Sequence, residues 1–309
     1  MTEESGATGA PRHTGTNPTG RPVRDLGIRT ASALVLGGVQ IGALVWGGTL
    51  WWALVVACIG VLCTTEFYAI TRSEHRKPNE LFGLIAVAAM PLATAWYMTD
   101  LRFERDWFTK AQHGVLGLTG VLAMLVIAAL VWHLVFRQVT TSDTSATVFG
   151  AVYVGFTLTH LVLMRELDSG TEFVLATLIS VWVNDTFAYA IGSPFGHHKL
   201  APTVSPKKSW EGLVAGTVGT IAVWVALPAF AQTALPAWWL GLTGLAVAVA
   251  AVLGDLAESR LKREVGVKDS GRLLPGHGGF LDRFDSMIMV SVVAFYMLLV
   301  GLQLFGGVR

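Results

Sequence analysis

Charged residues are scarce in this chain. Only 14% of its 309 residues are Asp, Glu, Lys or Arg, against about 25% in soluble domains, while 53% are hydrophobic. The net charge is +1, so the sequence offers no global attraction for a polyanion, and we expect no nucleic acid partner. This composition argues against an ordinary soluble domain and indicates a membrane protein.

Several other patterns are missing. The chain has two cysteines, Cys58 and Cys63, in one apolar run where a structural disulfide is not expected. Short strands of alternating polarity are absent, which argues against a membrane barrel. Residues 1–28 contain no apolar stretch, so we expect a disordered tail. We expect no cleavable signal peptide, because the first apolar run is long and continues directly into a second.

Long apolar runs make up most of the chain, each about as long as a bilayer-spanning helix. Because backbone groups in lipid must pair internally, we expect helices and an all-α polytopic membrane bundle. The first two runs share one apolar block, so eight or ten spans stay open beside nine. The expected spans are 30–47, 50–71, 81–98, 113–135, 146–164, 172–192, 212–231, 237–256 and 286–305.

The chain divides into three expected parts, and its basic residues suggest an orientation. The tail (1–28) precedes N-terminal transmembrane helices (29–170) and a C-terminal catalytic region (171–309). With the N-terminus inside, most of the 22 Lys and Arg residues fall on the cytoplasmic side, as the positive-inside rule requires. Polar loops 193–211 and 257–285 then face the cytoplasm, and the exceptions on the outer side are Arg102, Arg105, Lys110, Arg165 and Arg309.

Acidic residues mark both ends of the second polar loop. Asp255 and Ser259 are four residues apart and share a helix face, and Asp282 and Asp285 share another where the last span begins. An acid within a membrane helix is costly and suggests a function. Three converging carboxylates could supply oxygen ligands for Mg²⁺, whereas the plainer alternative makes Asp282 and Asp285 helix caps paired with Arg283 or Lys262.

The same loop is rich in groups that suit phosphate. A Gly-rich turn around His277 lets the backbone approach an anion, and His277 could contact a phosphate or a base. A positive-inside loop alone would explain several of the basic residues. The expected phosphate partners in this loop are Lys262, Arg263, Lys268, Arg272 and Arg283.

The first polar loop offers a second basic site. Ser205 followed by Pro206 predicts a helix start, and Lys207 and Lys208 in its first turn would oppose the helix dipole unless an anion binds there. The alternative is a lipid-facing basic collar. Asn184 and Asp185 precede this loop within a span, where they either support the site or hydrogen-bond between helices.

Glu66 lies near the end of an early predicted span. Its carboxylate is either functional or simply reaches the interface along its flexible side chain.

With these residues in place, the chain resembles the phosphatidate cytidylyltransferase family (the CDP-diacylglycerol synthases). The spacing Ser-x-x-Lys-Arg, Lys-Asp, then apolar-Pro-x-His-Gly-Gly-x-x-Asp-Arg-x-Asp matches throughout, most strongly over 180–309. Ser209, Ser193 and His197 depart from the pattern, which leaves the tuning of the first loop in doubt. The matching residues are Ser259, Lys262, Arg263, Lys268, Asp269, Leu274, Pro275, His277, Gly278, Gly279, Asp282, Arg283 and Asp285.

The resemblance implies an enzyme that joins CTP and phosphatidate into CDP-diacylglycerol and releases pyrophosphate. It implies Asp255, Asp282 and Asp285 as ligands of Mg²⁺, with room for a second metal ion, and Lys262 and Arg263 as catalytic cations. It further implies a bacterial inner-membrane protein with a cytoplasmic site, and a homodimer is left open. The implied phosphate-binding residues are Ser205, Lys207, Lys208, Ser259, Lys268, His277 and Arg283.

Three other functions compete with this interpretation. A cytidylyltransferase acting on another lipid phosphate, such as an archaeal ether lipid, would share the same chemistry. A secondary transporter would place its acids near the midplane and repeat its broken helices, and neither pattern is present. A CDP-alcohol phosphotransferase would need an Asp-Gly and Ala-Arg signature that is missing.

Overall fold

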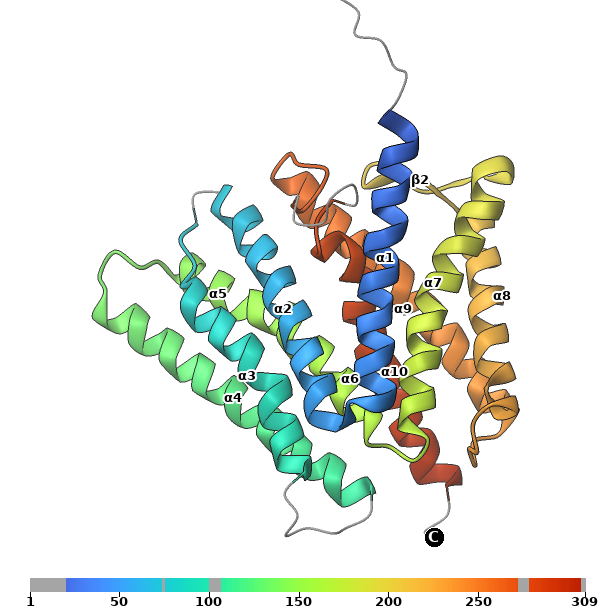
Figure 1. Cartoon of the computed structure of the whole chain (residues 1–309). Helices are drawn as coiled ribbons and strands as arrows, with labels where there is room; N and C mark the ends of the chain where they lie inside the picture. Colours follow the sequence, from blue (N-terminus) through green and yellow to red (C-terminus); the bar gives the residue numbers. More distant parts are fainter. Residues whose placement is uncertain (1–20, 74–75, 100–106, 272–277, 307–309) are drawn as a thin grey trace, which may run out of the picture.

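The chain folds into a bundle of long helices (Figure 1). The computed structural model describes residues 21–73, 76–99, 107–271 and 278–306. Its elements are α1 (Arg21–Trp46), α2 (Gly48–Ser73), α3 (Glu80–Thr99), α4 (Trp107–Val135), α5 (Thr141–Gly150), the π-helix η1 (Ala151–Phe156), α6 (Thr157–Arg165), α7 (Gly170–Phe195), β1 (Lys199–Ala201), β2 (Ser205–Ser209), α8 (Trp210–Ala226), the 3₁₀ turn η2 (Leu227–Ala229), α9 (Ala237–Glu264) and α10 (Leu281–Phe305).

The helical membrane fold expected from the sequence is confirmed. Within the described residues, eight helical segments are long and apolar enough to cross a bilayer, with α5, η1 and α6 joined into the single span Thr141–Arg165. The remaining helix, α1, has a shorter apolar part over Leu34–Trp46. The nine expected spans therefore correspond to nine helical segments, and α1 begins and α10 ends at opposite ends of the bundle (Figure 1).

Two predicted boundaries are wrong. Helix α1 begins at Arg21, so residues 21–28 are helical and do not belong to a disordered tail. Helix α9 continues to Glu264, two turns beyond its predicted end at 256, because polar residues can extend a helix once it has left the apolar core. Residues 1–20 lie outside the described residues, and the division at residue 170 stays a prediction.

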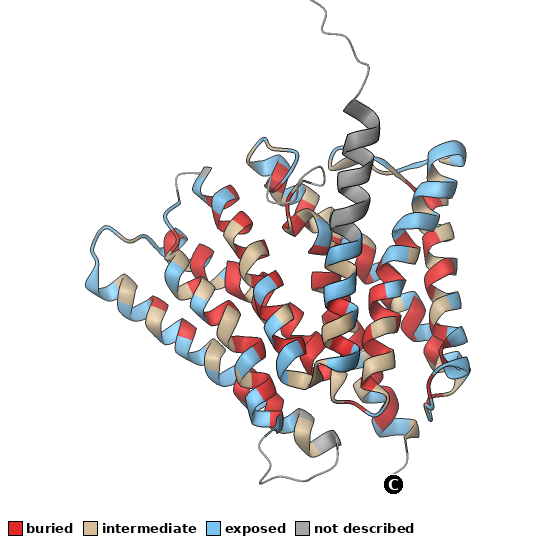
Figure 2. Ribbon diagram, viewed as in Figure 1, coloured by how far each residue is buried: buried red, intermediate tan, exposed pale blue. Residues whose placement is uncertain are grey.

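Buried side chains lie between the helices, and the outer faces are exposed (Figure 2). The exposed surface is itself apolar in many places, as at Trp46, Leu134 and Phe230, which suits contact with lipid. Small residues let helices approach closely where α9 crosses α10. A Cβ added to Gly254 would lie 2.6 Å from the carbonyl oxygen of Asp285, so this crossing tolerates only glycine.

A short hairpin replaces the helix start predicted at Ser205. Residues Ser205–Ser209 form β2, which pairs antiparallel with β1, and α8 begins only at Trp210. The Ser209 hydroxyl caps α8 by accepting the Gly212 N–H at 3.2 Å, and Glu211 lies in the first turn. This start avoids placing two lysines against the positive end of the helix dipole, the conflict that the sequence raised.

Candidate active site

The two predicted polar loops meet at one end of the bundle. Lys208 on β2 and Asp255 on α9 form an ion pair, with 2.6 Å between Nζ and Oδ2. Both side chains are about a quarter exposed, so the pair is open to solvent on one side. The sequence proposed two separate sites, and this contact makes them one.

A cavity of about 570 Å³ adjoins this pair, within the size range of small-molecule sites. Its walls come from α7, the hairpin, the start of α8 and the face of α9 that carries Asp255. Lysines and carboxylates therefore face the same space. The polar and aromatic residues that line it are Asn184, Asp185, Tyr189, Ser193, Lys199, Lys207, Lys208, Ser209 and Asp255.

Three carboxylates gather beside the cavity. Asp255 accepts a hydrogen bond from Ser259 Oγ at 3.1 Å, which confirms that these two residues share a face. Asp285 lies close enough to Asp255 and Asp185 for their charges to interact, as the tight crossing at Gly254 requires. Asp285 accepts the neighbouring backbone N–H of Ser286 at 2.6 Å.

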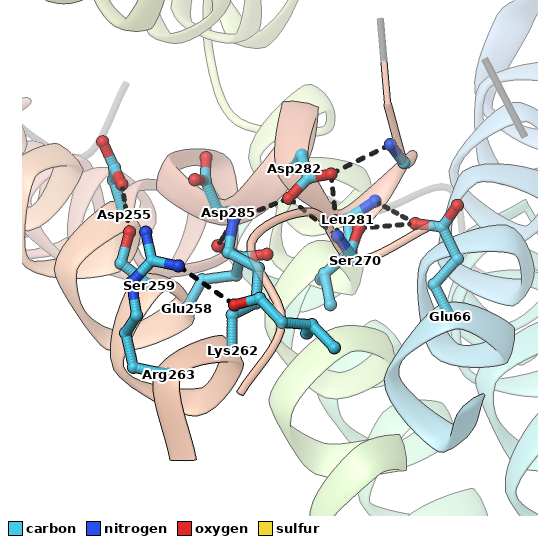
Figure 3. Close-up of polar contacts among 12 residues, drawn as sticks. Glu66, Asp255, Glu258, Ser259, Lys262, Arg263, Ser270, Leu281, Asp282 and Asp285 are labelled. Carbon is cyan, nitrogen blue, oxygen red and sulfur yellow. Dashed lines mark hydrogen bonds and ion pairs between the residues drawn. The ribbon is translucent and has the colours of Figure 1, made fainter. Parts of the chain in front are cut away.

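Asp282 has a different environment from the other two predicted metal ligands. Its carboxylate accepts Lys262 Nζ at 2.6 Å, Gly279 N–H at 2.9 Å and Ser270 N–H at 3.0 Å (Figure 3). These contacts match the alternative in which Asp282 pairs with Lys262 and ties down the start of α10. In the described part of the chain, no three His, Cys, Asp or Glu side chains converge closely enough to hold a metal by themselves.

Glu258 is a site residue that the sequence reasoning missed. It is fully buried one turn before Lys262, and its carboxylate lies 2.5 Å from Lys262 Nζ. Lys262 thus sits between Glu258 and Asp282 and is itself mostly buried. The signal was available, because an acid four residues before a lysine on one helix predicts such a pair.

The other predicted phosphate partners are more dispersed. Arg263 and Lys268 are exposed, and neither they nor Ser205 line the cavity. Arg283 is also exposed, and its charge acts on Asp185. Arg272 and His277 lie outside the described residues.

Asn184 bridges two helices. It is buried and donates to Thr220 Oγ1 on α8 at 3.2 Å. This contact is the interhelical hydrogen bond that the sequence offered as its plainer role, although Asn184 also lines the cavity.

Comparison with known proteins places these residues in a family. A family model described as "Cytidylyltransferase family" matches residues 27–300. A phosphatidate cytidylyltransferase of Mycobacterium bovis is 32% identical over 96% of this chain and 95% of its own length. The proteins of that name from Mycobacterium tuberculosis and Bacillus subtilis are 32% and 31% identical, over 96% and 85% of this chain and 88% and 94% of their own lengths.

The match runs through both halves of the chain, although the sequence resemblance was strongest only from residue 180 onward. The family match and the apolar helices together identify an integral membrane enzyme that transfers a nucleotidyl group. The chain belongs to the cytidylyltransferase family.

Proposed function

We propose that this enzyme makes CDP-diacylglycerol and pyrophosphate from CTP and phosphatidate. The observation that carries the proposal is the Lys208–Asp255 pair beside a cavity at the end of a membrane bundle. A lipid phosphate and a water-soluble nucleotide can both reach such a place. The names of the relatives, all phosphatidate cytidylyltransferases, support the choice of substrates.

In the proposed reaction, a phosphatidate oxygen attacks the α-phosphorus of CTP. The new P–O bond forms as the bond to the pyrophosphate oxygen breaks, and pyrophosphate carries away the electron pair. A phosphate monoester has its second pKa near about 6, so the nucleophile is already largely ionised at neutral pH and needs little help from a base. The protein's task is therefore to position two anions and to offset their charge.

The position of each basic residue suggests which phosphate group it contacts. Lys207 and Lys208 reach the cavity from the hairpin and suit the triphosphate. When phosphate enters, Lys208 can exchange its Asp255 partner for a phosphate oxygen, because both lie on the cavity wall. Lys262 is held by two carboxylates and acts mainly by fixing Asp282, while Arg263, Lys268 and Arg283 provide exposed positive charge for either substrate at the rim.

The donor set fits a magnesium ion that arrives with the nucleotide. Mg²⁺ usually takes one or two carboxylates and completes its shell with water and substrate phosphates, so it does not need three protein acids. Asp255 and Asp285 are the carboxylates placed to hold it, with Asp185 nearby, and Asp282 would have to leave Lys262 to join them. A bound Mg²⁺ would offset charge on the phosphates.

The same proposal sets the enzyme's orientation. We infer that the site end faces the cytoplasm, where CTP is available, and that the N-terminus lies on that side. The start of α1 lies at the same end of the bundle as the hairpin (Figure 1), and the excess of Lys and Arg at this end supports the assignment. A homodimer stays a prediction.

The test uses purified protein in detergent with labelled CTP, phosphatidate and Mg²⁺. We expect a lipid-soluble cytidine product and one pyrophosphate per turnover, both dependent on phosphatidate and on Mg²⁺. Product formed only with another lipid phosphate would retain the chemistry and replace the substrate. No product with any lipid phosphate, from protein that remains folded, would contradict the proposal.

A further inference from the structure

Glu66 is a buried acid that the reaction described above does not use. It lies on α2, far along the chain from the catalytic residues, and is only 4% exposed. Its Oε2 atom accepts hydrogen bonds from Ser270 Oγ and from the Leu281 N–H, each at 2.9 Å. Burying a carboxylate is costly unless it is paired or hydrogen-bonded, and among the described residues only Oε2 has hydrogen-bond partners, while Oε1 has none.

The Leu281 N–H is one of the unpaired donors at the start of α10. The residue before it, Phe280, supplies no side-chain cap, so the helix lacks the usual local partner for its first N–H groups. Glu66 fills that role from another helix. The carboxylate also suits the positive end of the α10 dipole, immediately before Asp282.

Glu66 and Asp282 accept hydrogen bonds from the same two segments of the chain, one at Ser270 and the other at residues 279–281, and they do so from opposite sides. Ser270 donates its hydroxyl to Glu66 and its N–H to Asp282, while Leu281 donates to Glu66 and Gly279 to Asp282. Figure 3 shows the two carboxylates flanking Ser270 and Leu281. We call this five-residue arrangement the buckle; it consists of Glu66, Ser270, Gly279, Leu281 and Asp282.

Two glycines let the buckle close. A Cβ on Gly271 would lie 2.2 Å from Glu66 Oε1, and one on Gly279 would lie 2.0 Å from Ser270 Oγ and 2.3 Å from Glu66 Oε2. No side chain can occupy these distances without displacing the carboxylate. The glycine of the signature at 279 is therefore explained by Glu66 and Ser270, in addition to any contact with substrate.

We propose that Glu66 is a positioning residue for the catalytic site. It fixes Ser270 and the first turn of α10, and through them the Asp282–Lys262 pair and the register of Asp285 beside Asp255. This inference rests on the proposed function for its kinetic consequence, but the positioning can be measured without it. It also gives the N-terminal helices a defined part in a site whose recognisable motifs lie in the C-terminal half.

The test compares three substitutions in the full-length protein in detergent. Glu66→Ala removes both hydrogen bonds, and Glu66→Gln keeps one carbonyl oxygen that can accept them. Asp143→Ala is the matched control, since Asp143 is also a buried acid (6% exposed) that accepts backbone N–H groups, from Lys77 and Thr140, away from the site. Each variant is measured for kcat, for the KM of CTP and for hydrogen exchange at Ser270, Gly279 and Leu281.

We expect Glu66→Ala to lower kcat by about tenfold to a hundredfold, because small misplacements of reacting groups have effects of that size. The KM of CTP should change less than about threefold, since the cavity lysines are untouched. Exchange should accelerate at all three amides. Glu66→Gln should recover kcat to within about threefold of wild type, and Asp143→Ala should leave kcat and these amides unchanged, whatever its effect on stability.

A Glu66→Ala enzyme with normal kcat and protected amides would overturn the proposal, as would Asp143→Ala producing the same pattern. If Glu66→Ala does not fold, Ser270→Ala tests the proposal instead. It removes the hydrogen bond from Ser270 Oγ to Glu66 and keeps the one from the Leu281 N–H. Faster exchange at Gly279 and Leu281 with a reduced kcat would support positioning, and no change would refute it. A wild type inactive on CTP and phosphatidate would defeat the proposed function, while the exchange results would still decide the buckle.

Discussion

The charged residues at the two ends of the bundle have different environments. At the end away from the site, Arg165 pairs with Glu166 at 3.2 Å and donates to Thr49 Oγ1 at 2.9 Å and to the Leu44 carbonyl at 3.3 Å. Both charged side chains there are less than 15% exposed. At the site end, the charges of Asp185, Asp255 and Asp285 interact beside an open cavity.

This difference separates a structural ion pair from a candidate ligand-binding site. The Arg165 group contains one cation and one anion, and its remaining donors reach a hydroxyl and a carbonyl, so its charge is balanced within the protein. The three aspartates repel one another, Lys208 offsets only part of their charge through its pair with Asp255, and a bound cation or substrate would relieve the rest. Breaking the first arrangement should affect stability, and breaking the second should affect activity.

The largest expected effect is that of Asp255→Asn. The amide keeps the shape and the Ser259 contact but removes the charge that faces both Lys208 and the proposed metal. We expect kcat/KM to fall by at least about a hundredfold, the size seen when one preorganised electrostatic contact is removed. Less repulsion among the three acids should leave the unfolding temperature equal or higher. Near-normal turnover at every Mg²⁺ concentration would remove Asp255 from the site.

Asp282→Asn should lower both stability and activity. It therefore tests whether Asp282 is a structural partner of Lys262 or a ligand of the proposed metal. The pair with Lys262 is mostly buried, but Glu258 still pairs with that lysine after the substitution, so the loss of stability should be about 1–3 kcal/mol. We expect a lower unfolding temperature together with a large loss of kcat, neither corrected by raising Mg²⁺. If added Mg²⁺ restored activity while stability stayed normal, the metal-ligand role predicted from the sequence would be correct. The contact between Asp282 and Lys262 would then be incidental.

The sequence predicted the membrane-spanning helices, the enzyme family and the contact between Asp255 and Ser259. Long apolar runs and residues four apart, such as Asp255 and Ser259, follow rules that depend on nearby residues only. The hairpin could not be foreseen, because Ser205-Pro206 suits a helix start equally well and pairing with β1 decided between them.

Contacts between distant segments were beyond the same reasoning. Lys208 reaches Asp255 only because α7, α8 and α9 pack side by side, and Glu66 reaches Ser270 across 204 positions. Nothing near Glu66 in the sequence indicates which loop it binds. An acid within an otherwise apolar predicted span was the sign that the sequence offered of a partner for Glu66.

Lys208→Ala should have an intermediate effect, confined to substrate binding. A hydrogen bond to a charged group contributes about 1.5–3 kcal/mol, so we expect the KM of CTP to rise about tenfold or more, with a smaller change in kcat. The control is Arg260→Ala, which removes an exposed cation of α9 paired with Glu264. Equal effects of the two variants would mean that Lys208 only adds to a basic collar at the membrane surface.

Arg165→Ala should have the smallest effect on activity. It tests whether the end of the bundle away from the site serves stability alone. Losing the cation leaves Glu166 buried with Thr49 as its polar contact and leaves the Leu44 carbonyl without its donor, so stability should fall by about 3 kcal/mol. The turnover of the protein that remains folded should equal that of wild type, measured after thermal unfolding has established the folded fraction. A loss of kcat comparable to that of Asp255→Asn would show that the two ends are coupled through the helices. The separation of a structural end from a chemical end would then be wrong.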